Sequence, residues 1–122
     1  MIVCVMDDLM ASINISSLAK GIGGVDLYFE RVPGQVLSSI REKQPSLVIF
    51  DLNSRKMEPM AAIAAMKSDP ALASVRTVGF VSHVDADTVA AARAAGIDQV
   101  LARSAFVERL GSILGPSSTS TT

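Results

Sequence analysis

Five short apolar runs alternate with longer, helix-length segments along this chain of 122 residues, and this alternation limits the fold more than any other feature. The runs are Ile2 to Met6, Val25 to Phe29, Leu47 to Phe50, Thr77 to Val81 and Gln99 to Ala102. Short continuous apolar runs of this kind are typical of strands buried on both faces. Strands that alternate with helices form a parallel sheet covered on both faces by right-handed crossovers. The sequence therefore predicts a doubly wound α/β sandwich, (βα)5, with a five-stranded parallel sheet.

The intervening segments carry apolar residues at helical spacing and end at glycine or proline. Asp85 or Asp87 is expected to cap the fourth helix, and Gly96 is expected to end it. The residues expected to face the core are Ala11, Ile15, Leu18 and Ile22 in the first helix, Val36, Leu37 and Ile40 in the second, Met60, Ile63 and Met66 in the third, and Val107, Leu110 and Leu114 in the fifth.

Composition limits the class of protein. A net charge of −1 and a pI near 5.7 provide no basic surface for nucleic acid or an anionic membrane. Cys4 is the only cysteine, so we interpret it as a small core residue. No apolar run approaches the roughly 18 residues of a membrane span. We expect one soluble, cytoplasmic domain over residues 1–115, followed by a disordered tail or linker start at 116–122.

Polar side chains stand at the ends of four of the five predicted strands. They are Asp7, Asp8, Asp51, Ser82 and Arg103. In open α/β sheets, ligands bind outside the carboxyl ends of the strands, where the strand order reverses. If the strand order is 2-1-3-4-5, as in flavodoxin-like folds, the three aspartates surround one crevice. Two carboxylates about 4 Å apart repel each other by about 4 kcal/mol at an effective dielectric near 20, so the acids must bind a cation or shift their pKa values.

The residue types at these strand ends suit phosphoryl transfer. An all-oxygen site with open positions fits Mg²⁺, which keeps water and binds phosphate. Arg103 supplies a permanent positive charge and Ser82 a hydroxyl donor. Asp51 is then placed to act as a nucleophile toward a phosphoryl group, whose charge the metal and Arg103 neutralise.

The chain from Ile2 to about Leu114 resembles a response-regulator receiver domain (CheY-like) of two-component signalling. "VMDDL" resembles the paired acids of that family, "VIFDLNS" the segment with the phosphoacceptor, and "AAGIDQVLARSAF" the fourth helix end and fifth strand. The resemblance implies that Asp51 accepts the phosphoryl group, assisted by Ser82 and Arg103. It also implies Mg²⁺ bound directly by Asp8 and Asp51, by Asp7 through water, and by the backbone carbonyl of Asn53.

The chain departs from the family pattern at three places. Ser54-Arg55 replaces the usual Met-Pro or Leu-Pro pair, Arg103-Ser104 replaces the usual lysine and proline, and Val100 replaces the switch aromatic. An atypical or pseudo-receiver therefore stays open as an alternative, a binding module in which Arg103 pairs with Asp51 independently of phosphorylation. A third class, a metal-dependent phosphatase, would need a general acid and a substrate pocket that the sequence does not reveal.

The resemblance also implies partners. A histidine kinase or phosphotransfer protein would supply the phosphoryl group in a phosphorelay, and an output protein or a C-terminal effector would receive the signal. The fourth helix carries little charge over its body, so with the fifth strand and fifth helix it is a candidate homodimer surface, although alanine's helix propensity explains the same composition. We expect a phosphoprotein that is not an enzyme and has no direct contact with nucleic acid or membrane.

Overall fold

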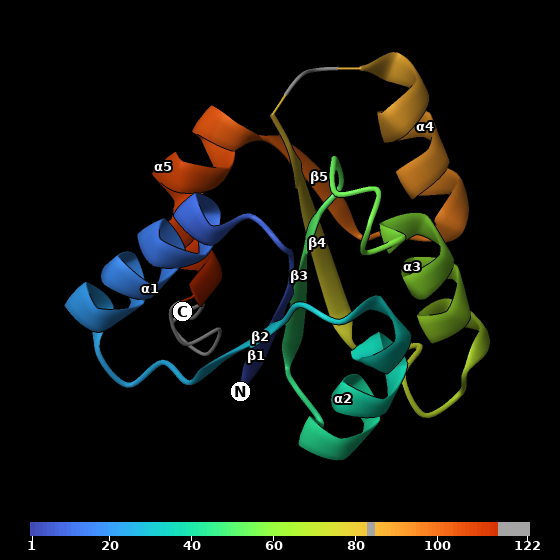
Figure 1. The fold of residues 1–122 in the computed structure, drawn as a ribbon, viewed down its shortest axis with the longest axis horizontal. Coiled ribbons are helices and arrows are strands. Elements are labelled where there is room, and N and C mark those ends of the chain that lie inside the picture. The colour runs from blue at the N-terminus through green and yellow to red at the C-terminus, as the bar shows by residue number, and fades with distance from the viewer. Residues whose placement is uncertain (83–84, 115–122) are drawn as a thin grey trace.

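The computed structural model describes residues 1–82 and 85–114, in which strands and helices alternate along the chain (Figure 1). The predicted tail at 116–122 lies outside the described residues. The elements are β1 (Ile2–Val5), α1 (Leu9–Ile22), β2 (Leu27–Glu30), the short 3-10 helix η1 (Pro33–Gln35), α2 (Val36–Lys43), β3 (Leu47–Asp51), α3 (Pro59–Ser68), β4 (Arg76–Val81), α4 (Ala86–Ala95), β5 (Gln99–Ala102) and α5 (Arg103–Leu114).

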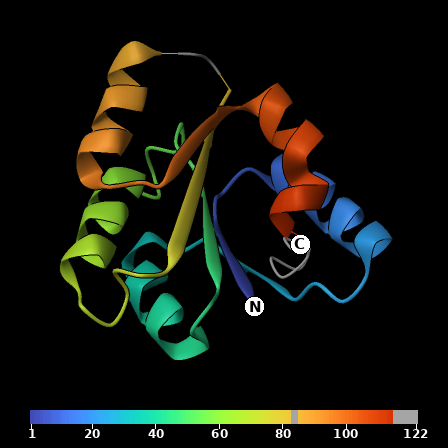
Figure 2. The same ribbon diagram turned by 180° about the vertical axis from the view of Figure 1, so that it is seen from behind.

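All five strands form one parallel sheet in the order β2-β1-β3-β4-β5, which confirms the predicted order. Strand β3 lies at the centre, and each of its residues is buried. Helices α1 and α5 cover one face of the sheet, while α2, α3 and α4 cover the other (Figures 1 and 2). Among the described residues, no helix has the length and apolarity to span a membrane.

The core is split into two layers by the alternation of side chains along the strands. Cys4 and Ile49 point to the layer under α1 and α5, whereas Val5 and Phe50 point to the layer under α2, α3 and α4. Both faces of each central strand are therefore apolar, which explains the continuous runs in the sequence. Burial raises the pKa of the Cys4 thiol to about 12, consistent with its interpretation as a core residue.

Helix α1 buries the predicted residues in its first half but not in its second. Leu18 and Ile22, expected in the core, are 41% and 39% exposed. Ala11 and Ile15 are buried as predicted, and Ala19 continues their stripe at a spacing of four residues. Apolar residues surround this helix on several sides, so the pattern alone did not determine its rotation about its axis.

Helix α5 shows a similar correction at one position. Val107, predicted to face the core, is 47% exposed, while its neighbour Phe106 is buried and stacks on Phe80 with ring centroids 4.8 Å apart. Leu110 is buried as predicted, and Ile113 is buried as well. The aromatic ring fills more of the core than valine would. This determines which face of α5 turns toward the sheet. The side chain of Leu114 lies outside the described part of the chain.

Helix α4 has the predicted ends. The Asp85 carboxylate accepts hydrogen bonds from the Asp87 backbone N–H (3.0 Å) and the Thr88 hydroxyl (2.8 Å), so Asp85 rather than Asp87 is the cap. Gly96 ends the helix at a φ of 105°, where a side chain would be strained.

Strand β2 begins later than predicted and ends on Glu30, a buried acid that the sequence analysis did not single out. Its carboxylate accepts hydrogen bonds from the Val32 backbone N–H at 3.0 Å and from the hydroxyls of Ser39 and Tyr28. These donors compensate for the loss of water around the carboxylate and attach α2 to the sheet edge.

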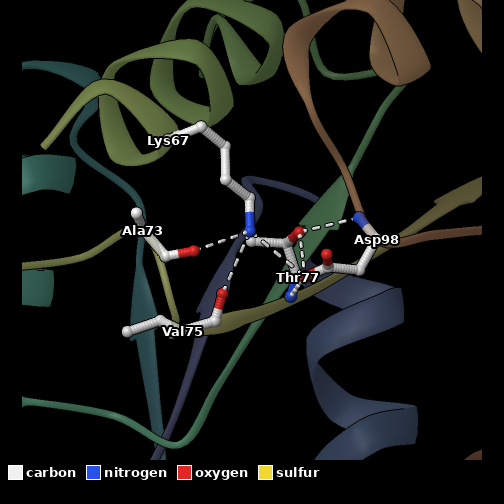
Figure 3. A network of polar contacts seen from close by, with 5 residues as sticks. All are labelled: Lys67, Ala73, Val75, Thr77 and Asp98. Carbon is white, nitrogen blue, oxygen red and sulfur yellow. Dashed lines mark hydrogen bonds and ion pairs between the residues drawn. The ribbon is translucent and has the colours of Figure 1, made fainter. Parts of the chain in front are cut away.

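A polar network joins α3, β4 and the turn before β5 at the amino-terminal ends of the strands (Figure 3). Asp98 Oδ2 accepts hydrogen bonds from the Thr77 backbone N–H (2.8 Å), the Thr77 hydroxyl (3.0 Å) and Lys67 Nζ (3.2 Å). Lys67 Nζ also donates to the carbonyls of Ala73 and Val75. Burial by itself raises the pKa of Asp98, but these hydrogen bonds outweigh burial and hold it below its ordinary value.

We expect Asp98→Ala to lower the free energy of unfolding by about 2 kcal/mol at pH 7, because the buried Thr77 N–H loses its acceptor. Since the folded-state pKa of Asp98 is below the unfolded one, its contribution is present above the unfolded pKa and is lost as pH falls through the folded pKa. The difference between wild type and variant should therefore shrink below about pH 4. Urea unfolding of both proteins at several pH values measures this difference in the free energy of unfolding.

Asp26→Ala is the matched control, because Asp26 is exposed and its side chain has no hydrogen bond within the described part of the chain. We expect it to change stability by less than about 0.5 kcal/mol. Equal unfolding midpoints for Asp98→Ala and Asp26→Ala would contradict the assignment of a stabilising role to the network.

Candidate functional site

Asp51 ends the central strand β3 at the carboxyl edge of the sheet and is 7% exposed. Its Oδ1 accepts a hydrogen bond from the Asn53 backbone N–H at 3.0 Å, and no described residue donates to Oδ2. Burial raises the pKa of Asp51, and the charges of Asp8 and Asp7 raise it further. The Asn53 hydrogen bond and the Arg103 charge act in the opposite direction without reversing the shift.

The register of the sheet explains why these acids come together. Strand β1 pairs with β3 so that Val5 lies beside Phe50, and both chains then continue past the sheet edge. Asp7 and Asp8 follow β1 there, next to Asp51. The predicted meeting of these acids at the edge between the first and third strands is therefore present, and the acids are close enough to affect each other's charge.

Asp8 caps helix α1. Its Oδ1 accepts hydrogen bonds from the backbone N–H groups of Met10 (2.9 Å) and Ala11 (3.2 Å), as an N-cap carboxylate does. Its Oδ2 lies 4.0 Å from Nη1 of Arg103, and both side chains are partly exposed. A carboxylate at a helix N-terminus is also favoured by the helix dipole, so Asp8 stays in place beside Asp51.

Arg103 begins α5 directly after β5, and its ion pair is with Asp8. The alternative prediction of an Arg103–Asp51 pair is wrong in this structure, because none of the ion pairs among the described residues joins these two side chains. The guanidinium acts on Asp51 only as a more distant positive charge. Within residues 1–82 and 85–114, no cation is therefore paired with Asp51.

Ser82 follows β4 and Asn53 follows Asp51, and a hydrogen bond joins them. The side-chain oxygen of Asn53 accepts the Ser82 backbone N–H at 2.6 Å. Both residues are exposed, and the Ser82 hydroxyl is free of hydrogen bonds to described residues. The loops after β3 and β4 are thus connected beside the buried carboxylate.

Ser54 is a site residue that the sequence analysis noted only as a departure from the family pattern. It is 7% exposed, and its hydroxyl donates to Asp7 Oδ1 at 2.6 Å. The signal in the sequence was a small hydroxyl residue three positions after Asp51. That signal could not identify the partner, because Asp7 lies 47 residues away in the chain.

The acids after β1 and β3 offer carboxylate oxygens, the ligands that a hard divalent cation prefers. Within residues 1–82 and 85–114, no three acidic, histidine or cysteine side chains lie close enough together to enclose a metal ion. The oxygen-only donors and the incompletely compensated negative charge around Asp51 nevertheless fit a hydrated Mg²⁺, which uses one or two carboxylates and keeps several waters. The residues therefore fit an open, water-rich site rather than a closed protein cage.

Comparison with known proteins gives a fold but no family by sequence, since no family model and no curated protein matches the chain. A response regulator from Hahella chejuensis matches with a TM-score of 0.81 and 21% identity, over 99% of this chain and 96% of that one. The Mn²⁺-bound form of the response regulator Rcp1 matches with a TM-score of 0.75 and 20% identity, over 99% and 95%.

The phosphorylated cyanobacterial phytochrome response regulator RcpA matches with a TM-score of 0.72 and 19% identity, again over 99% and 95%. Identities this low establish the fold. The chain has the flavodoxin-like fold of response-regulator receiver domains, as its sequence resemblance implied.

Proposed function

We propose that this chain is a receiver module of two-component signal transduction that accepts a phosphoryl group on Asp51. The observation that carries the proposal is the position of Asp51. It ends the central strand, is nearly buried, lies beside Asp7 and Asp8, and has no cation paired with it among the described residues. A carboxylate with a raised pKa at the carboxyl edge of a parallel sheet is typical of a functional site.

The proposed step uses a phosphohistidine of a kinase or phosphotransfer protein, or a small phosphoramidate. Oδ2 of Asp51 forms a bond to phosphorus while the P–N bond breaks, and its electron pair stays on the departing nitrogen, which takes up a proton. Oδ1 keeps its hydrogen bond from the Asn53 N–H, which orients the carboxylate for attack. Arg103 and the Ser82 hydroxyl are the groups assigned to receive the new phosphoryl oxygens.

Asp8, Asp51 and the Asn53 carbonyl are the proposed direct ligands of Mg²⁺, and Asp7 is proposed to bind it through water. When bound, the cation supplies positive charge that offsets the carboxylates and the incoming phosphoryl group. The structure of response regulator Rcp1 is an Mn²⁺-bound form, which supports a divalent site in this fold. Asp8 would keep its α1 cap through Oδ1 and turn Oδ2 from Arg103 toward the metal.

The phosphodonor is proposed to contact the exposed face of α1 next to the site. Leu9, Met10 and Ile13 are large apolar side chains that are all about half exposed or more, and they follow Asp8 directly. An apolar patch beside a reactive carboxylate favours a protein donor over a small metabolite. The chain would accept the group and pass on its signal through protein contacts, without turning over a substrate as an enzyme does.

The signal is proposed to leave through α4, β5 and α5. The outer face of α4 consists mainly of exposed alanines, with Arg93 as an exposed charge in its last turn. A smooth surface of small side chains lets a partner approach closely. An output protein, a C-terminal effector or a second copy would use this surface.

The proposal is tested by incubating the wild-type protein with Mg²⁺ and a small phosphoramidate donor and measuring its intact mass. We expect one phosphoryl adduct, and we expect chelation of Mg²⁺ to suppress its formation. The phosphoacceptor assignment would be overturned if no adduct forms and if the absorbance or fluorescence spectrum of the protein does not change on addition of Mg²⁺. Adduct formation that is equally fast with and without chelator would overturn the role assigned to the cation.

A further inference from the structure

Ser54 is the loop residue whose side chain reaches back to the acids after β1. Its hydroxyl donates to Asp7 Oδ1 at 2.6 Å, and this hydrogen bond joins the loop after β3 to the loop after β1. We propose that Ser54 is a positioning residue that holds the Asp7 carboxylate at the divalent-cation site and thereby sets the affinity for the cation. This inference rests on the proposed function and deepens it.

The backbone directs the Ser54 hydroxyl toward Asp7. The Ser54 N–H donates to the Asp51 carbonyl at 3.2 Å, which closes a turn immediately after the phosphoacceptor. The turn buries Ser54 and points its side chain toward the neighbouring strand end. The geometry of Asp51 and the position of the Asp7 carboxylate are thus linked through one residue.

The hydrogen bond has the length of a strong one. Hydroxyl-to-carboxylate bonds are charge-assisted, are usually about 2.5–2.7 Å long and are roughly twice as strong as neutral ones. Ser54 is nearly excluded from water, so solvent competes poorly for its hydroxyl. Asp7 itself is exposed, and this hydroxyl is the donor to its carboxylate among the residues that the structure describes.

The electrostatics around Asp51 give this bond its proposed importance. Asp7 and Asp8 both repel the charge of Asp51, so a freely rotating Asp7 carboxylate would turn toward solvent. The Ser54 hydrogen bond opposes that rotation through Oδ1 and leaves Oδ2 available. Loss of an outer-shell partner typically lowers metal affinity by about 10- to 100-fold. Asp7, proposed to hold the cation through water, belongs to that shell, so loss of the hydroxyl that positions it is expected at the lower end of this range.

The test measures cation affinity directly, apart from phosphorylation. Mn²⁺ replaces Mg²⁺ at oxygen-rich sites, so titration with Mn²⁺ followed by electron paramagnetic resonance gives a dissociation constant. We expect Ser54→Ala to weaken Mn²⁺ binding about tenfold and Ser54→Thr, which keeps the hydroxyl, to stay within about twofold of wild type. Ser17→Ala, on the exposed face of α1, is the matched control and should leave the affinity unchanged.

A background lacking the Asp7 charge separates positioning from a general loss of structure. If Ser54 acts through Asp7, Ser54→Ala should have no further effect on Mn²⁺ affinity in an Asp7→Asn protein. Equal affinity of Ser54→Ala and wild type would overturn the inference and leave the proposed function intact, as would an undiminished Ser54→Ala effect in the Asp7→Asn background. Absence of Mn²⁺ binding to wild type would overturn both this inference and the proposed metal site.

Discussion

Replacing Asp51 by asparagine is expected to abolish the phosphoryl adduct and, at the same time, to stabilise the metal-free fold at neutral pH. The adduct is lost because an amide oxygen is too weak a nucleophile to displace the donor nitrogen. The fold gains because the amide keeps an acceptor for the Asn53 N–H but carries no charge next to Asp7 and Asp8. One substitution therefore moves two independent measurements in opposite directions.

The sign of the stability effect follows from the raised pKa of Asp51. A group whose folded pKa lies above its unfolded value contributes stability below the unfolded pKa, and that contribution is lost as pH rises through the folded pKa. At pH 7 the ionised Asp51 is therefore unfavourable to folding. We expect Asp51→Asn to raise stability by on the order of 1 kcal/mol, or about 4 °C in Tm for a domain of this size.

Intact mass after treatment with phosphodonor and thermal unfolding in the presence of chelator are the two measurements. Asp26→Asn serves as the control, because it removes one exposed carboxylate far from the site in sequence and should change neither result. An adduct that persists in Asp51→Asn would mean that another side chain is the acceptor. A lower Tm for Asp51→Asn would contradict the charge repulsion inferred at the site.

Arg103→Ala is expected to slow adduct formation by about a hundredfold, the usual loss when a charge-stabilising donor is removed from a reacting centre. By the resemblance to receiver domains, Arg103 corresponds to a lysine of that family, and its guanidinium is 4.0 Å from the Asp8 carboxylate. Arg103→Lys should keep most of the rate, because a single positive charge is the shared requirement. The rate is read from intact mass over time.

The free energy of unfolding of Arg103→Ala shows whether the slower adduct formation comes from the site or from a general loss of structure. The Arg103–Asp8 pair is partly exposed, so its removal should cost no more than about 1 kcal/mol. Arg41→Ala is the matched control, since Arg41 forms an ion pair with Asp69 that connects α2 to the end of α3. Faster adduct formation in Arg103→Ala would reverse the assignment and make Arg103 a restraint on the acceptor.

The linear pattern of residues was enough to determine the architecture and the identity of the strand-end residues. Leu47 to Phe50 could only be buried on both faces, and this required a parallel sheet with helices on each side. Parallel strands deliver their carboxyl ends to one edge, so Asp7, Asp8 and Asp51 were expected there. That they meet also required β1 and β3 to be neighbours in the sheet. These conclusions depend on periodicity and connectivity, which are local properties of the chain.

Tertiary packing alone decided which atoms pair. Arg103 binds Asp8 rather than Asp51, and Ser54 binds Asp7, although neither preference is visible in residue spacing. Packing likewise chose Ala19 over Leu18 for the core, because the sheet and α5 determine how α1 is rotated. Side-chain pairing depends on differences of a few ångströms between elements distant in sequence. Those differences arise only when the two layers of the core close around the sheet.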